Sequence, residues 1–294
     1  MTESSLISPV NSDCVADLRW LLNPDNDLLK SLPPFTAFEF AHSAYLEAWL
    51  LELQQNPEPL YRFLGHQRHG ARLGLYFESL LRFYFRYCPV SAHSLVGHNI
   101  KLYGDLQHPQ RTTGELDFLL QDRTGLKHLE VAVKFYLGRQ RGEDWQWLGP
   151  NPTDTLARKV AHLSAHQLPI SANLRYGRQA IKQRLFLVKG ALFTPWQAET
   201  RDIPTPDYCQ PYAHHHYWLY QNALEDFFAH HTHTWFVLQK QQWLSCVSEK
   251  KLTHWQQLLN TKAAQMLVTW ENGEPRRLMV MHNEWPLALE DAKH

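Results

Sequence analysis

Two segments in which apolar and polar residues alternate lie in the middle of the chain. They are TTGELDFLL, residues 112–120, and HLEVAVKFYL, residues 128–137. The short stretch QDRTGLK, residues 121–127, connects them. Successive side chains of a strand point to opposite faces, and a two-residue turn with Arg123 and Thr124 at its centre joins two strands into an antiparallel hairpin. The pattern therefore predicts a β-hairpin with one face in the core.

The two faces of this hairpin differ in polarity. Seven apolar side chains share the predicted core face: Leu116, Phe118, Leu120, Leu129, Val131, Val133 and Phe135. The opposite face carries Glu115, Asp117, Glu130, Ala132 and Lys134. With the expected turn, Asp117 lies directly opposite Glu130, and Glu115 lies opposite Ala132. A register shifted by one residue would send the acids of one strand to the other face.

Asp117 and Glu130 repel each other unless something neutralises them. Opposed residues of antiparallel strands have Cβ atoms about 4.5 to 5.5 Å apart, and like charges at that distance destabilise a sheet. A divalent cation removes the repulsion, and Mg²⁺ or Mn²⁺ accepts one or two carboxylates together with water and phosphate oxygens. We therefore expect a metal site here. Charged residues that decorate a strand surface are the alternative interpretation.

Two further charged residues are candidates for the same site. Lys134 lies four residues after Glu130 on the same face, where a lysine would orient an attacking water or neutralise charge that develops on a phosphate. Glu78 lies on the segment 71–87, which is apolar around most of a helix and is therefore expected to be central. A strand-edge lysine and a helix-surface ion pair of Glu78 with Arg82 are the simpler interpretations.

The remaining patterns predict helices and strands around this hairpin. Expected helices are the segment ADLRWLLNP, which Pro24 ends, and residues 36–55, 71–87 and 152–168, the last capped by Thr153 or Asp154. Expected strands are HNIKLYGD and residues 184–193. This order of helix, hairpin, helix and strand indicates a layered α/β domain.

Composition excludes several classes of protein. The chain has 294 residues, 44% of them apolar, which is enough for a large core. Its 29 basic and 29 acidic residues cancel, so a polyanion would have to meet a local basic patch. The four cysteines form no CxxC pair, no signal peptide is recognisable, and no apolar stretch approaches a membrane span. We therefore expect a cytoplasmic protein without a membrane segment.

Histidine clusters near the C-terminus suggest zinc only weakly. HHH at 214–216 and HHTH at 230–233 lack the HExxH and paired CxxC spacings of zinc sites, so exposed or hydrogen-bonded histidines are favoured. The chain also lacks GxGxxG, GxxxxGK[ST] and GxSxG, which argues against dinucleotide, P-loop and α/β-hydrolase chemistry.

Together these motifs resemble a known superfamily. A helix glutamate, an acid on one strand and a (D/E)xK-like second strand are similar to the PD-(D/E)XK nucleases. RLGLYFESLLRF, TTGELDFLL, HLEVAVKFYL and WLGPNPTDTL more closely resemble the bacterial DUF1853 family, which is assigned to that superfamily. The resemblance implies a restriction-endonuclease-like core with a central mixed sheet flanked by helices. It also implies that Asp117, Glu130 and the Val131 carbonyl hold Mg²⁺, supported by Glu78.

One position departs from the motif of the superfamily. The lysine normally lies two residues after the second acid, where this chain has Ala132, and Lys134 lies about 6 to 7 Å further along the strand. The following helix offers Lys159 and Gln167, and many superfamily nucleases use a glutamine there. They are separated by about two helical turns, so both are able to face the site. Solvated polar side chains are the alternative.

The resemblance suggests three regions and a function. We expect a helical N-terminal extension at 1–60, a nuclease-like core at 61–194 and a mixed C-terminal elaboration at 195–294 that packs on the core. The expected activity is metal-dependent cleavage of DNA or RNA. The basic stretches KFYLGRQR and LRYGRQAIKQR would contact the phosphates, unless they are ordinary solvated loops. The alternative is a non-catalytic module that binds nucleic acid or protein and retains the nuclease fold.

Overall fold

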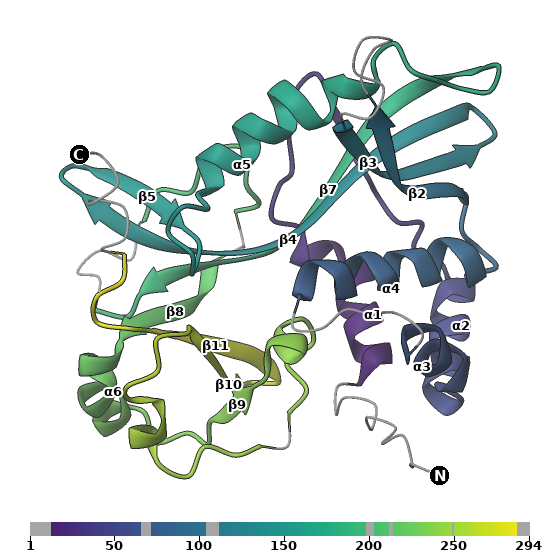
Figure 1. The fold of residues 1–294 in the computed structure, drawn as a ribbon. Coiled ribbons are helices and arrows are strands. Elements are labelled where there is room, and N and C mark those ends of the chain that lie inside the picture. The colour runs from purple at the N-terminus through teal and green to yellow at the C-terminus, as the bar shows by residue number, and fades with distance from the viewer. Residues whose placement is uncertain are drawn as a thin grey trace, which may run out of the picture.

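A large mixed sheet runs through the molecule, with helices on both faces (Figure 1). The computed structural model describes residues 13–65, 72–103, 112–197, 203–211, 214–248 and 250–286. Along the sheet the strands follow the order β2 (Ser94–Tyr103), β3 (Thr112–Asp122), β4 (Gly125–Arg141), β7 (Gln179–Pro195), β8 (His214–Tyr220), β11 (Glu274–Met281), β10 (Gln265–Glu271) and β9 (Phe236–Leu238). Three short strands join it at the side: β1 (Thr36–Ala37), β5 (Asp144–Leu148) and β6 (Arg175–Tyr176).

The centre of the sheet is parallel and its two ends are antiparallel. β4, β7, β8 and β11 pair in parallel, whereas β2, β3 and β4 at one end and β11, β10 and β9 at the other pair antiparallel. β4 and β7 are 17 residues long and are paired from Leu126 to Leu137 of β4. These two strands connect the hairpin region with the C-terminal part of the sheet. The predicted mixed α/β sheet is confirmed.

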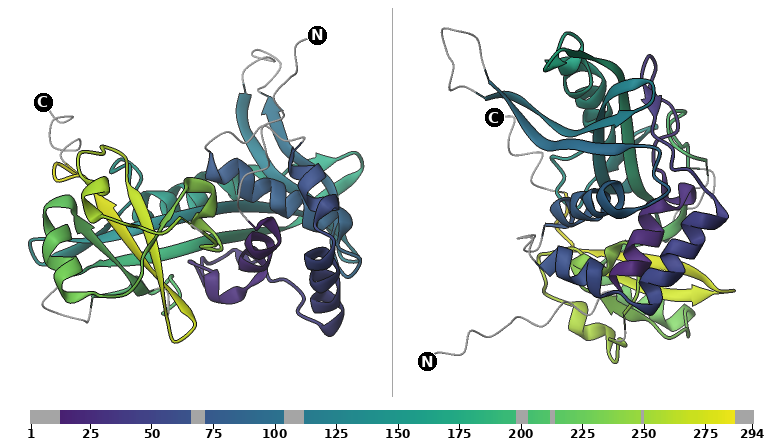
Figure 2. Two further views of the ribbon diagram at one scale, coloured as in Figure 1. Left: turned by 90° about the horizontal axis from the view of Figure 1, so that it is seen from below. Right: turned by 90° about the vertical axis from the view of Figure 1, so that its right-hand side faces the viewer.

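Helices cover opposite faces of this sheet. The four helices α1 (Cys14–Leu22), α2 (Ala44–Gln55), α3 (Glu58–Gly65) and α4 (Leu73–Tyr87) pack together on one face, and α5 (Leu156–His162) lies on the other (Figures 1 and 2). The short helix α6 (Leu224–His230) belongs to the C-terminal part. Because the sheet is covered on both faces at β4, a polar side chain there is either buried or lies at the sheet's edge.

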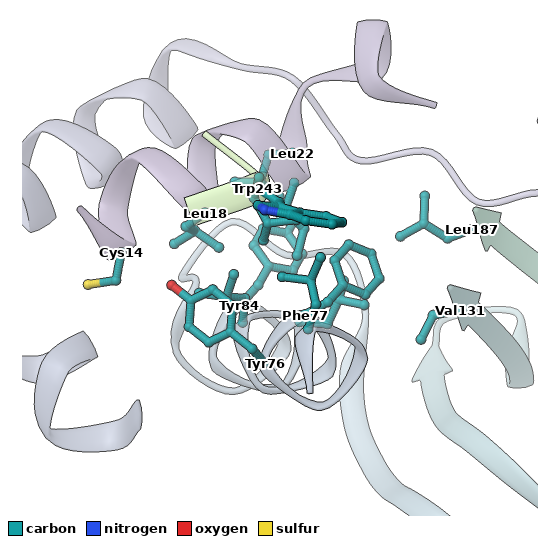
Figure 3. Close-up of a cluster of buried hydrophobic side chains, with 14 of the residues drawn as sticks. Cys14, Leu18, Leu22, Tyr76, Phe77, Tyr84, Val131, Leu187 and Trp243 are labelled. Atoms are coloured by element: carbon teal, nitrogen blue, oxygen red, sulfur yellow. The ribbon is translucent and has the colours of Figure 1, made fainter. Parts of the chain in front are cut away.

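α4 is the central helix of the N-terminal group, as its apolar circumference predicts. Tyr76, Phe77 and Tyr84 of α4 are buried between α1 and the sheet. Figure 3 shows them in one cluster with Leu18 of α1 and with Val131 of β4, which approaches from the sheet side. This packing fixes the position of α4, and therefore of Glu78, relative to β4.

The predicted hairpin register is confirmed. The pairs between β3 and β4 run from Asp122 opposite Gly125 to Phe118 opposite Leu129. The Asp122 side chain closes the turn, because its Oδ1 accepts the N–H of Thr124 at 2.7 Å. An Asx-type contact of this kind stabilises a tight turn, and the predicted position of the turn is confirmed.

Two predicted helix starts are wrong. Residues 36–55 do not form one helix, since β1 pairs with β7 and α2 begins only after Ser43, whose hydroxyl accepts the N–H of Leu46 at 3.2 Å. The residues before Ser43 have apolar residues at helical spacing, but Thr36 and Ala37 pair with β7 instead of forming a helix. Likewise α5 begins after Thr155, whose hydroxyl accepts the N–H of Arg158 at 3.1 Å, so neither Thr153 nor Asp154 is the cap.

Two of the C-terminal histidines are positioned to hydrogen-bond to the backbone, and the cysteines are buried. His230 and His231 each place Nδ1 within hydrogen-bond distance of a backbone oxygen, at 2.8 and 2.9 Å. The side chains of His214 and His215 lie outside the described residues. All four cysteines are buried and free. In the described ranges, no helix is long and apolar enough to cross a membrane.

Candidate functional site

The β3–β4 hairpin splits at Asp117. The backbone ladder ends at Phe118 and Leu129, and from there the Asp117 side chain replaces a backbone partner, since its Oδ2 accepts the N–H of Val131 at 2.9 Å. Glu130 Oε1 lies 3.5 Å from the Asp117 nitrogen. The structure therefore brings the two predicted acids together, as neighbours at the point where the strands separate.

Glu130 is buried and held by three elements. Its side chain is 1% exposed, and its two oxygens have different partners. His128 places Nε2 2.6 Å from Oε1, and Gln167 donates from Nε2 to Oε2 at 2.6 Å. The other ring nitrogen of His128 lies 2.8 Å from the Ser171 hydroxyl. A buried carboxylate with both oxygens hydrogen-bonded has a fixed orientation.

His128 and Ser171 were not predicted as site residues. His128 precedes Glu130 by two residues, so strand alternation places it on the same face, and that signal was present in the sequence. Its complete burial was not apparent, because a histidine next to a turn is usually partly exposed. Ser171 follows α5 by nine residues, and no local pattern links it to β4.

Burial and like charge raise the pKa of Asp117 to about 8. Burial has the largest effect, the charge of Glu130 comes next, and Glu78 adds to it. The N–H of Val131 and the charge of Lys159 act in the opposite direction. The positive charge near Asp117 therefore does not offset its burial and the charge of Glu130, and a bound cation would supply the missing positive charge.

Glu78 lies at the margin of the acid pair. It points from α4, and the Asn99 amide donates to its Oε2 at 3.4 Å. Burial raises the pKa of Glu78, and the charges of Glu115 and Glu130 raise it further. Glu115 itself is exposed on β3. The structure thus places Glu78 within electrostatic reach of the pair and leaves Glu115 at its solvent side.

Lys159 and Gln167 approach the acid pair from α5 and the turn after it, on the face of the sheet opposite α4. Lys159 donates to Gln167 Oε1 at 2.9 Å, and Gln167 in turn donates to Glu130. Between them the helix widens into a π turn, in which the N–H of Leu168 bonds to the carbonyl of Leu163 at 3.0 Å. Such a turn rotates the residues after it, and π turns are frequent at functional sites. Both side chains therefore lie on the same side of α5, with Gln167 between Lys159 and Glu130.

Lys134 has a different partner. Its ammonium pairs with Asp154, just before α5, and the same carboxylate accepts the hydroxyl of Tyr136 at 3.2 Å. Lys134 is about one third exposed, and the hydrogen bonds described for it do not include either acid of the pair. It therefore ties β4 to the start of α5.

The donor atoms suit a hard cation that keeps water ligands. Two carboxylates are present, and the Val131 carbonyl faces the same neighbouring strand as the Val131 N–H, which is bonded to Asp117. Glu130 Oε2 has a second lone pair beyond its hydrogen bond to Gln167, whereas Oε1 already faces both His128 and the Asp117 N–H. Within the described ranges, however, no three His, Cys, Asp or Glu side chains gather as a metal cluster. The set fits Mg²⁺, which needs only one or two carboxylates, better than zinc.

The two basic stretches occupy different places. Residues 134–141 form the end of β4, and residues 174–184 form most of the β6–β7 hairpin, where Arg175 and Arg178 are exposed. At the end of β4, Arg139 lines a cavity of about 520 Å³ together with Trp145 and Trp196. A cation beside indole rings is a suitable surface for a nucleotide.

Comparison with known proteins places the chain in a family without assigning it an activity. No curated protein and no solved structure matches it. A family model described as "Domain of unknown function (DUF1853)" matches residues 16–290, which is nearly the whole chain. The protein is therefore a member of the DUF1853 family.

Proposed function

We propose that this protein is a metal-dependent phosphodiesterase that cleaves nucleic acid on a restriction-endonuclease-like core. The supporting observation is the buried pair of Asp117 and Glu130 at the split of the hairpin, with a pKa of about 8 at Asp117. An acid that only decorates the surface would be exposed, whereas Glu130 is buried and has hydrogen-bond contacts with His128, Gln167 and the Asp117 N–H. Strained electrostatics of this kind, located where strands separate, are typical of a functional site.

The architecture around the pair supports the proposed core. β4 continues from the hairpin, α5 crosses the opposite face, and β7 then pairs with β4 in parallel. α4 precedes the hairpin and presents Glu78 toward it. This is the order of elements that the resemblance to PD-(D/E)XK nucleases implies.

Each residue has a separate part in the proposed reaction. Asp117, Glu130 and the Val131 carbonyl would hold Mg²⁺ or Mn²⁺, which when bound supplies a polarised phosphate and an activated water. His128 and Gln167 keep Glu130 oriented. Glu78 would support the site through water. In the step itself, the water oxygen forms a bond to phosphorus, the bond to the leaving oxygen breaks, the water loses a proton to solvent, and the leaving oxygen gains one.

Nucleic acid is the proposed substrate because of the surface chemistry at the end of β4. Arg139, Trp145 and Trp196 line one cavity, and exposed arginines lie on the β6–β7 hairpin. Arginines contact phosphates, while aromatic rings stack on bases with about 1–3 kcal/mol per base. A small phosphodiester would not need both.

A non-catalytic binding module is the second candidate. It is favoured by one observation, namely that Ala132 occupies the usual lysine position while Lys134 pairs with Asp154. In that case the acid pair would remain without a catalytic role, and the basic and aromatic surface would still bind nucleic acid.

Cleavage assays with matched variants separate these functions. Single- and double-stranded DNA and RNA are incubated with the purified protein and Mg²⁺ or Mn²⁺, then resolved by length. We expect cleavage that EDTA abolishes and that Asp117→Asn and Glu130→Gln each lower by at least about 100-fold. Glu115→Gln is the control, since Glu115 is an exposed acid on the same strand. Binding without any metal-dependent cleavage by the unmodified protein would refute the enzymatic function.

A further inference from the structure

We infer that Lys159, on α5, is the catalytic lysine of this site and that Lys134 is a structural anchor. This inference rests on the proposed function. A positively charged side chain close to the attacked phosphate stabilises the negative charge that develops there. The strand position that would normally supply it holds Ala132, whose methyl group carries no charge.

Lys159 is the lysine whose contacts lead to the acid pair. Its ammonium lies 2.9 Å from Gln167 Oε1, and the Nε2 of that amide lies 2.6 Å from Glu130. The opposite charges of Asp117 and Glu130 both act on Lys159. One amide therefore separates the ammonium from the carboxylate that would bind the metal.

Lys159 is held in a way that suits a catalytic group. It is largely buried. Burial lowers its pKa and the charge of Lys134 lowers it further, while the acid pair and Asp154 oppose that change. The π turn from Leu163 to Gln167 aligns the amide that orients the ammonium. Gln167 Oε1 accepts a hydrogen bond from one N–H of the ammonium. An ammonium has three N–H donors, so it is able to donate to a phosphate oxygen as well.

Lys134 has the contacts of an anchor instead. Its charge is neutralised by Asp154, and the hydroxyl of Tyr136 shares the same carboxylate. Moving this ammonium to the acid pair would leave Asp154 without its ion pair. The carboxylate lies one residue before the cap of α5, so the pair positions the helix that carries Lys159.

In the reaction, Lys159 remains protonated throughout. As water adds to phosphorus and the leaving-group bond breaks, negative charge grows on the non-bridging oxygens, and the ammonium stabilises that charge. Ala132, on the same strand face, packs against the apolar cluster to which α5 contributes Leu156, and it supplies no charge of its own.

Lysine variants of the full chain test this assignment. We expect Lys159→Met to lower the rate of oligonucleotide cleavage by at least about 100-fold, and Lys159→Arg to retain more activity than Lys159→Met. Lys134→Met should lower the rate less than Lys159→Met does, because Lys134 acts only through the position of α5. Lys101→Met, at an exposed position of β2, is the matched control and should stay within about threefold of the unmodified protein. Lys159→Cys, alkylated with 2-bromoethylamine, should regain at least about tenfold, because the product again carries an ammonium; the natural cysteines are buried and should react slowly.

Metal binding gives a readout that does not depend on cleavage. Removing a positive charge beside the acid pair should tighten Mn²⁺ binding by at least about threefold in Lys159→Met. The double variant Lys134→Met/Asp154→Asn removes the other ion pair without changing the net charge, so it should leave Mn²⁺ binding unchanged. Full cleavage by Lys159→Met, or a large loss confined to Lys134→Met, would overturn the assignment. If the unmodified protein binds Mn²⁺ but cleaves nothing, the proposed function fails and the catalytic role of Lys159 fails with it. If Mn²⁺ affinity does not respond to Lys159→Met, the placement of Lys159 beside the acids is wrong even where cleavage is observed.

Discussion

Asp17 is a buried acid whose replacement should change how the stability of the fold depends on pH. It lies on α1, where its Oδ2 accepts the hydroxyl of Tyr76 at 2.6 Å and its Oδ1 accepts the N–H of Ser245 at 3.0 Å. Burial raises its pKa from 3.8 to about 6, despite these hydrogen bonds. Tyr76 precedes Glu78 by two residues on α4, so this contact also supports the position of the candidate site.

The size and direction of the effect follow from linkage. A folded-state pKa above the unfolded value means that the folded protein binds the proton more tightly. The stabilising contribution is therefore complete below about pH 3.8 and is lost as pH rises through about 6. At 1.36 kcal/mol per pKa unit, the difference between 3.8 and about 6 corresponds to about 3 kcal/mol, most of which is lost between pH 4 and pH 7.

Urea unfolding at several pH values measures this contribution. The free energy of unfolding of the natural protein minus that of Asp17→Asn should fall by about 2 kcal/mol between pH 4 and pH 7. Glu52→Gln, at an exposed position of α2, controls for the removal of one negative charge. A difference that stays constant over this range would show that Asp17 does not titrate as its burial indicates, and the reasoning would be refuted.

Three further changes test separate parts of the structure. Gly190→Ala should destabilise the fold by about 3 kcal/mol or more in thermal unfolding, because Gly190 has φ +146° and an added Cβ would lie 1.6 Å from the Lys134 carbonyl oxygen. A loss below about 1 kcal/mol, which is the size of the effect of a glycine-to-alanine change within a helix, would contradict this. Gln167→Ala should cost about 1.5–3 kcal/mol, since it removes a donor to buried Glu130, and unchanged stability would argue against that bond. Arg139→Ala should lower the slope of log affinity against log salt for single-stranded DNA by about 0.7, the effect of one lost phosphate contact, and an unchanged slope would place the nucleic acid elsewhere.

The hairpin and its acid pair were predictable because they depend on local rules. Alternation determined which side chains share a face, and the Asp122 to Gly125 turn determined the register as far as Phe118 opposite Leu129. Asp117 and Glu130 were therefore placed as neighbours without knowledge of any other element, although the ladder ends just before them. The central position of α4 followed from its apolar circumference in the same way.

The surroundings of that pair depended on contacts between distant segments. Pairing of β1 with β7 ended a helical pattern that looked continuous from residue 36, and no local signal marks such pairing. The burial of His128 against Ser171 and the choice of Asp154 as the partner of Lys134 also required the packing of α5 on the sheet.

The sequence was therefore sufficient to predict where the two acids lie, whereas the partners of the two lysines depended on the packing of α5. A carboxylate on a strand is placed by backbone geometry within a few residues, whereas a lysine has a long side chain whose ammonium goes to whichever partner the folded chain presents. Lys134 and Lys159 have the same side chain, and the sequence does not distinguish their partners. The packing of α5 on β4 places Lys134 next to Asp154 and Lys159 next to Gln167.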